Sequence, residues 1–148
     1  MAITYNVYNG STKVAEGLTE KSYKVEGLSP NTEYTFGVTS VNGDQESAKT
    51  AVKVKTAAQP VTGITPSQQT MSIKVGDADR AVSFTVAPAN ATNKNFTVAS
   101  SDEAVATYVD GKVHPVAEGS ANIVATASDG SGVKATIAIT VSAAEPIE

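Results

Sequence analysis

Few residues in this chain could carry catalysis or bind a metal, because it has one histidine and no cysteine. The lack of cysteine excludes thiol catalysis, disulfide bonds and cysteine-based zinc sites. His114 stands directly before Pro115, near the end of an expected strand. A catalytic histidine needs a nucleophile or a carboxylate at hydrogen-bond distance, and no sequence motif supplies one. We therefore interpret His114 as a structural or exposed residue.

Acidic residues near turn signals are the remaining candidates for a cation site. A calcium site needs six to eight oxygen ligands that converge from a few loops. Asp77 and Asp79 could begin such a site, but no EF-hand-like or repeated spacing follows them. Carboxylates in turns commonly accept hydrogen bonds from their own backbone, and this is the interpretation that we prefer. The other residues of this kind are Asp102, Glu103, Asp110 and Asp129.

Motifs of common enzyme classes are absent from the sequence. There is no phosphate-binding loop, no GxSxG, no HExxH and no GxGxxG after a strand. Asn9, Asn90 and Asn95 each begin a match to the N-glycosylation signal. We interpret these matches as coincidental, because no secretory signal peptide follows Met1. The sequence predicts a protein that is not an enzyme and needs no cofactor.

Charge and hydropathy patterning narrow the range of partners. The net charge is −4, and the eleven basic residues are scattered singly. Nucleic-acid binding depends on clustered lysine and arginine, so no nucleic-acid partner is expected. Every apolar run ends well short of the roughly 18 residues of a membrane span. Without a signal peptide, a natural start at Met1 predicts synthesis in the cytosol and no export by the general secretory route.

Apolar residues alternate with polar ones along most of the chain, which is typical of half-buried β-strands. Val, Thr, Ala, Ser and Gly are abundant, and Asn-Gly or Asp-Gly pairs mark tight turns. The pattern predicts an all-β fold. Strands are expected around residues 3–8, 13–16, 23–25, 34–41 and 52–54, and again around 71–75, 82–86, 96–98, 105–108, 123–125 and 137–141.

The segment Leu28–Val38 reads LSPNTEYTFGV and resembles the corner between strands E and F of a fibronectin type III domain. The resemblance implies that Tyr34 is a buried corner tyrosine. It also implies that residues 1–57 hold strands C, C′, E, F and G. Strands A and B have no counterpart, because such sandwiches span about 100 residues and this segment is about half as long.

Residues 61–143 resemble a bacterial Ig-like domain of group 2. The resemblance rests on a series of short matches in one order, among them VTGIT, PANATNK, SSDEAVAT, AEGS and the closing ITV. Val98 stands where the family usually has a tryptophan, so a lighter core is expected. The fold class is therefore two tandem β-sandwich modules, the first incomplete. Residues 58–60 are the expected linker, which Pro60 stiffens, and 144–148 a tail.

An incomplete first module has consequences for function, because a half-sandwich leaves an apolar face and open strand edges. Either the strands close into a small sheet that stands alone, or the face docks on another protein or another copy by packing or strand addition. The alternating pattern favours docking. The candidate contact residues are Ile3, Tyr5 and Val7 on one strand, with Tyr23 and Val25 as the uncovered face.

Both module types serve as spacers and binding surfaces, so the fold does not assign a role. Modules of these two families recur on particles of tailed bacteriophages. The resemblance implies a virion component, with head decoration favoured over the tail, whose partners are a capsid or tail protein, other copies of the chain, or host-surface carbohydrate. The alternative is a spacer or adhesion module at a bacterial cell surface.

Overall fold

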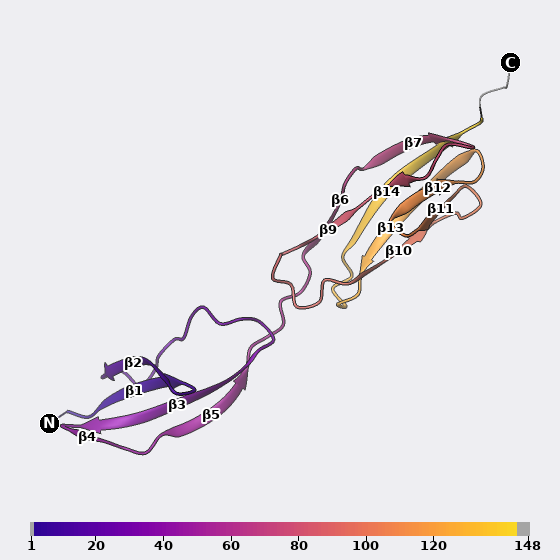
Figure 1. The fold of residues 1–148 in the computed structure, drawn as a ribbon. Helices are drawn as coiled ribbons and strands as arrows, with labels where there is room; N and C mark the ends of the chain where they lie inside the picture. The colour runs from indigo at the N-terminus through magenta and orange to yellow at the C-terminus, as the bar shows by residue number, and fades with distance from the viewer. Residues whose placement is uncertain (1, 145–148) are drawn as a thin grey trace. The chain divides into compact units, whose positions relative to one another are not determined.

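A computed structural model describes residues 2–144, and these fold into two compact units that divide between Ala58 and Gln59. The described residues form strands and turns without a helix, which confirms the all-β fold class. No helix in this part of the chain could therefore cross a membrane. Figure 1 shows the two groups of strands in chain order.

The first unit, residues 2–58, is a single antiparallel sheet. β1 and β2 form a hairpin, β1 also pairs with β3, and β3 pairs on its other side with both β4 and β5 (Figure 1). Gly10 and Ser11 connect the two strands beyond the last pair, Asn9 with Thr12, and the positive φ of Gly10, 61°, suits the tight turn. The strands are β1 (Thr4–Asn9), β2 (Thr12–Leu18), β3 (Glu33–Asn42), β4 (Gln45–Glu46) and β5 (Thr50–Lys55).

The strand expected around Tyr23 and Val25 does not form, so that prediction was wrong. No strand lies between Leu18 and Glu33 in the described chain, and this segment runs along one side of the sheet (Figure 1). The physical reason is the lack of a ladder partner. A strand needs a neighbour for its backbone N–H and C=O groups, and within residues 2–144 no backbone hydrogen bond joins residues 19–28 to a strand.

The corner at Tyr34 is present but less covered than expected. The backbone N–H of Ser29 donates to the Tyr34 hydroxyl at 2.9 Å. This bond joins β3 to residues 19–32, the crossing segment between β2 and β3. Tyr34 is half-buried rather than buried, because the residues that the structure describes form one sheet here and place no second layer over its ring. The Tyr34 ring stacks on Phe36, two residues further along the same face, with centroids 5.9 Å apart.

The second unit, residues 59–144, packs its sheets around a core of buried apolar side chains. A four-stranded sheet has the order β10-β13-β14-β7, with β7 parallel to β14, and a three-stranded sheet has the order β11-β12-β8. A short pair, β6 and β9, completes the unit. The strands are β6 (Gly63–Pro66), β7 (Thr70–Lys74), β8 (Arg80–Ala81), β9 (Phe84–Ala87), β10 (Phe96–Ser100), β11 (Ala106–Val109), β12 (Lys112–Pro115), β13 (Gly119–Ala127) and β14 (Lys134–Ser142).

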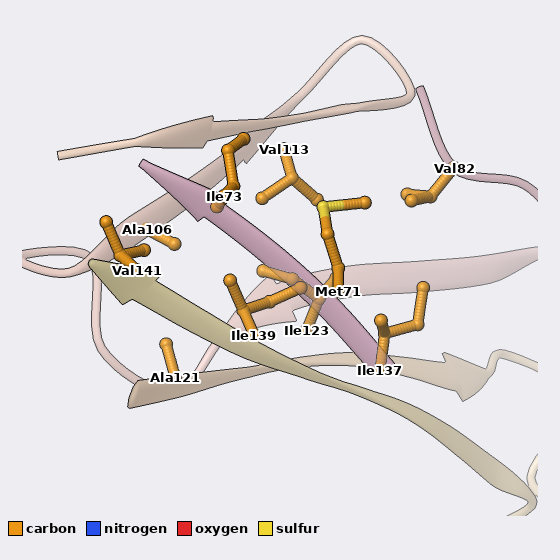
Figure 2. Close-up of a cluster of buried hydrophobic side chains, with 10 residues drawn as sticks. All are labelled: Met71, Ile73, Val82, Ala106, Val113, Ala121, Ile123, Ile137, Ile139 and Val141. Carbon is orange, nitrogen blue, oxygen red and sulfur yellow. The ribbon is translucent and has the colours of Figure 1, made fainter. Parts of the chain in front are cut away.

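The core of the second unit follows from strict alternation along its long strands. In β14 every second residue is buried, including Ile137, Ile139 and Val141. Figure 2 shows these side chains together with Ile73 of β7, the neighbouring strand in the same sheet, and with Val113 of β12 in the three-stranded sheet. Val98 packs at the edge of this cluster as a partly buried residue. This unit therefore closes its own sandwich and needs no outside surface to cover it.

Separate hydrogen bonds fix the last residues of the first unit and the first residues of the second. In the first unit, the carbonyl of Ala57 accepts a hydrogen bond from Asn31 N–H at 3.0 Å. In the second, Gln59 and Thr92 exchange two hydrogen bonds of 2.8 Å, one through each residue's N–H. Ala58 is the residue between these two anchors. The domain boundaries expected from the sequence remain a proposal.

Candidate docking face of the first unit

One face of the first sheet is apolar over four neighbouring strands, β2, β1, β3 and β5. The register places Val7 of β1 opposite Val38 of β3, and Phe36 of β3 opposite Val52 of β5. Side chains alternate between the two faces along a strand. Every second residue counted from Val7, Val38 or Val52 along its own strand therefore lies on the same face. No charged side chain occurs among the strand residues that make up this apolar face: Tyr5, Val7, Leu18, Tyr34, Phe36, Val38, Val52 and Val54.

The apolar face contains a hollow of about 600 Å³ between the sheet and the segment that crosses it. The strands contribute the floor, and the crossing segment contributes a wall that includes Tyr23, Val25 and Leu28. Glu20 and Lys21 lie at the same hollow and supply its charged groups. A mostly apolar hollow of this size, with a few polar groups in its lining, has the character of a binding site.

The structure brings four of the five predicted contact residues together at this hollow. Tyr5, Val7, Tyr23 and Val25 line it, whereas Ile3 does not and is 54% exposed. Tyr23 is also exposed, and its hydroxyl reaches the carbonyl of Val14 at 3.4 Å. Their role in binding a partner remains a prediction.

Sequence reasoning missed the part of the face that is least covered. Val38, Val52 and Val54 are 44%, 59% and 45% exposed, and all three lie on β3 or β5. The alternation of Phe36 with Val38 and of Val52 with Val54 was the available signal. This alternation identified the strands. Only the register between strands showed that Val38, Val52 and Val54 lie on the same face as Val7.

The opposite face of the sheet is polar and is organised by one carboxylate. Glu46 Oε1 accepts hydrogen bonds from Asn6 Nδ2 at 2.9 Å and from the Tyr8 hydroxyl at 2.7 Å. The Thr39 hydroxyl donates to the same oxygen. These three bonds lower the pKa of Glu46 to about 2, with the bond from Thr39 as the largest cause. The cluster fixes β4 against β1 and β3 and stabilises the charged carboxylate.

Lys49 covers the aromatic ring of Tyr8 on this polar face. Its ammonium lies 3.9 Å from the ring centroid and donates to the carbonyl of Gly10 at 3.1 Å. A Cβ atom at Gly37 would lie 2.4 Å from Lys49 Cδ, so a side chain there would push the lysine aside. The sheet therefore presents one polar face and one apolar face, and the apolar one is the candidate docking face.

The candidate chemical residues of the second unit serve its turns and its surface. His114 Nδ1 lies 2.7 Å from Asp79 Oδ1, and both side chains are exposed, at 57% and 47%. Asp77 accepts from Lys74 N–H, Asp102 from Ala104 N–H, and Asp129 from the N–H groups of Ser131 and Val61. These bonds confirm the interpretation of Asp77, Asp102 and Asp129 as turn carboxylates. The pKa of Asp129 is lowered by a hydrogen bond from the Ser131 side chain and by those from the N–H groups of Val61 and Ser131. No group of metal-binding side chains is found within residues 2–144.

The fold is that of a protein built from Ig-like and fibronectin-like modules. The family profile for the bacterial Ig-like domain (group 2) matches residues 60–138, which is more than half of the chain. The chain therefore belongs to the bacterial Ig-like domain (group 2) family. The profile for the fibronectin type III domain matches residues 2–53, ahead of the Ig-like domain. Both resemblances stated from the sequence are confirmed.

A curated relative is an Ig-like virion protein of Serratia phage KSP90, which is 42% identical over 79 residues. The match takes in 52% of this chain and 30% of the relative, so the chain spans less than a third of that protein's length.

Among solved structures, this chain is similar to domains 1-6 of the surface layer protein SbsC, with a TM-score of 0.51 and 21% identity. The match covers 99% of this chain and 20% of the SbsC chain. This chain is also similar to mouse cadherin-23 EC22-24, with a TM-score of 0.53 and 12% identity, and the match covers 98% of this chain and 55% of the cadherin chain. At these identities the likeness concerns the fold alone.

Proposed function

We propose that this chain is a non-enzymatic structural component of a tailed bacteriophage particle. The observation that carries the proposal is the 42% identity with the Ig-like virion protein of a Serratia phage. The families of both units are typically non-catalytic, which agrees with the lack of enzyme motifs in the sequence.

The first unit attaches the chain to the particle in this proposal, and the second unit is displayed. The difference in burial between the units supports this division. Val7 is the one buried hydrophobic residue that the structure describes before Val61, whereas the second unit contains two buried apolar clusters. A unit with so little buried surface gains most from an apolar partner surface.

The site of attachment is the head in our proposal, where the chain decorates the shell and stabilises it. The partners are a capsid protein, or in second place a tail protein, and neighbouring copies of the chain. The displayed Ig-like domain binds host-surface carbohydrate weakly. The alternative, a spacer or adhesion module at a bacterial surface, predicts the chain in cell-envelope fractions instead.

Mass spectrometry of particles purified from the source tests the proposal. We expect the chain in intact particles at a copy number that matches a capsid symmetry, and in heads after heads and tails are separated. Recovery with tails alone would contradict head decoration but leave the virion assignment standing. Its absence from particles, together with recovery in a cell-envelope fraction, would replace the proposal with the surface module.

A further inference from the structure

The uncovered part of the apolar face extends across two paired strands, so an extended strand would cover it better than a small ligand would. Its exposed residues, Val38, Val52 and Val54, lie on the neighbouring strands β3 and β5. Paired strands lie about 4.8 Å apart, so one or two extended segments laid along these strands would cover the exposed valines. A β-sandwich is closed by a second layer in this position.

The wall of the hollow presents a free backbone edge to such a segment. Within the described residues, the backbone groups of residues 19–28 make no hydrogen bond to any strand. Tyr23, Val25 and Leu28 nevertheless line the hollow from this segment. The segment thus has the apolar side chains of a strand without a strand partner, and its N–H and C=O groups are available for pairing.

We propose that the occupant of this hollow is an extended β-strand of another virion protein, which pairs with the backbone of residues 22–28 and completes the sandwich. The inference rests on the proposed function and specifies how the first unit binds its partner. Every second side chain of the added strand is apolar and uncharged, because the floor beneath it has no charged group to pair with a buried charge. Main-chain hydrogen bonds give such strand addition its affinity.

A second copy of the chain is a poorer occupant. Each strand in residues 2–144 is already paired within its own unit. Residues 19–28 of a second copy are unpaired, but they already line that copy's own hollow and would leave the floor of both hollows uncovered. The edge strand β5 also carries Lys53 and Lys55, and lysines on an edge disfavour edge-to-edge pairing.

A strand fused to the full chain tests this proposal without the unidentified partner. The probe is a seven-residue strand of alternating valine and threonine, joined ahead of Met1 by a flexible Gly–Ser linker of about 15 residues. The tether raises its effective concentration to the millimolar range. The matched control has the same linker and strand, with proline at the central valine. Proline removes a ladder donor and disfavours a strand interior.

Amide hydrogen exchange of residues 22–28 is the readout. We expect exchange about tenfold slower with the Val–Thr strand than in the parent chain, and the parent rate with the proline control. Unchanged exchange in both fusions, or equal protection in both, would overturn the proposal. Slow exchange in a parent chain that sediments as a dimer would also overturn it, by making a second copy the occupant. The measurement uses no particles, so its outcome is independent of the virion assignment.

Discussion

Asn6 Nδ2 donates a hydrogen bond to Glu46 Oε1 at 2.9 Å, although 40 residues separate the two along the chain. Tyr8 and Thr39 donate to the same oxygen, so the carboxylate joins β1, β3 and β4 on the polar face of the first sheet. The residues of this cluster alternate along the strands with apolar residues such as Val7 and Val38, whose side chains lie on the opposite face. This difference in polarity between the two faces is the basis for the proposed docking through the apolar face.

The Glu46 cluster predicts acid sensitivity of the first unit. Its three hydrogen bonds lower the pKa from the ordinary value of 4.5 to about 2 in the folded state. The unfolded chain therefore binds a proton at higher pH than the folded chain does. The contribution of Glu46 to stability is present above about pH 4.5 and is lost as the pH falls towards 2.

Thermal melts of the full chain between pH 6 and pH 2, followed by amide NMR signals of the first unit, check this prediction. Glu46→Gln should flatten the dependence of Tm on pH. Glu26→Gln is the matched control, because Glu26 is an exposed carboxylate that pairs with Lys24. An equal pH dependence in the parent chain and in Glu46→Gln would contradict the prediction.

Charges on the uncovered floor should weaken docking without unfolding the chain. Val38→Lys and Val54→Lys place an ammonium on side chains that are 44% and 45% exposed, so we expect stability to change by about 0.5 kcal/mol or less. Occupancy on particles that lack the chain should fall by about tenfold or more, because the partner would bury the new charge. Quantitative mass spectrometry of reconstituted particles measures the occupancy.

Val109→Lys is the control for the docking experiment, since Val109 is 62% exposed but lies in the second unit. It should leave the occupancy unchanged. If Val109→Lys reduced occupancy while the Val38 and Val54 variants did not, the second unit would be the attachment site.

Unfolding in urea should occur in two steps, with the first unit unfolding at the lower concentration. Among the described residues, Val7 is the one buried hydrophobic residue in that unit, whereas Ile137 lies fully buried in the second. Ile137→Ala should destabilise the second unit by about 2–5 kcal/mol and leave the first step in place. Amide NMR signals from each unit separate the steps. A single shared transition would contradict this division.

The corner tyrosine should hold the crossing segment in place. Tyr34→Phe removes the acceptor of the Ser29 N–H, and we expect a loss of about 0.5–1.5 kcal/mol, towards the lower end because Ser29 is exposed. Amide exchange at Ser29 should become faster. Tyr23→Phe is the matched control, since the Tyr23 hydroxyl makes one longer contact of 3.4 Å, and it should leave Ser29 exchange unchanged.

The second unit was largely predictable from sequence because its pattern and its packing agree. The alternation of Ile137, Ile139 and Val141 marks a half-buried strand, and those residues are buried in β14. The turn at Asp110-Gly111 was also predictable, and both residues have positive φ there. Such signals are local, since they depend on side-chain period and on backbone conformations that few residues accept.

The first unit shows where local pattern is insufficient. Tyr23 and Val25 carry the alternation of a strand, yet the segment remains unpaired because a strand also requires a neighbour. The Glu46 cluster carried no sequence signal, because two of its three donors, Asn6 and Tyr8, lie on β1, 40 and 38 residues before Glu46.

By itself, then, the sequence determined the all-β class, the order of the two families and most of the strands, through residue period, turn chemistry and matched motifs. Only the tertiary structure decided which valines of β3 and β5 remain exposed and which carboxylate organises the opposite face. Those properties depend on register and on contacts between distant segments, which no local pattern encodes.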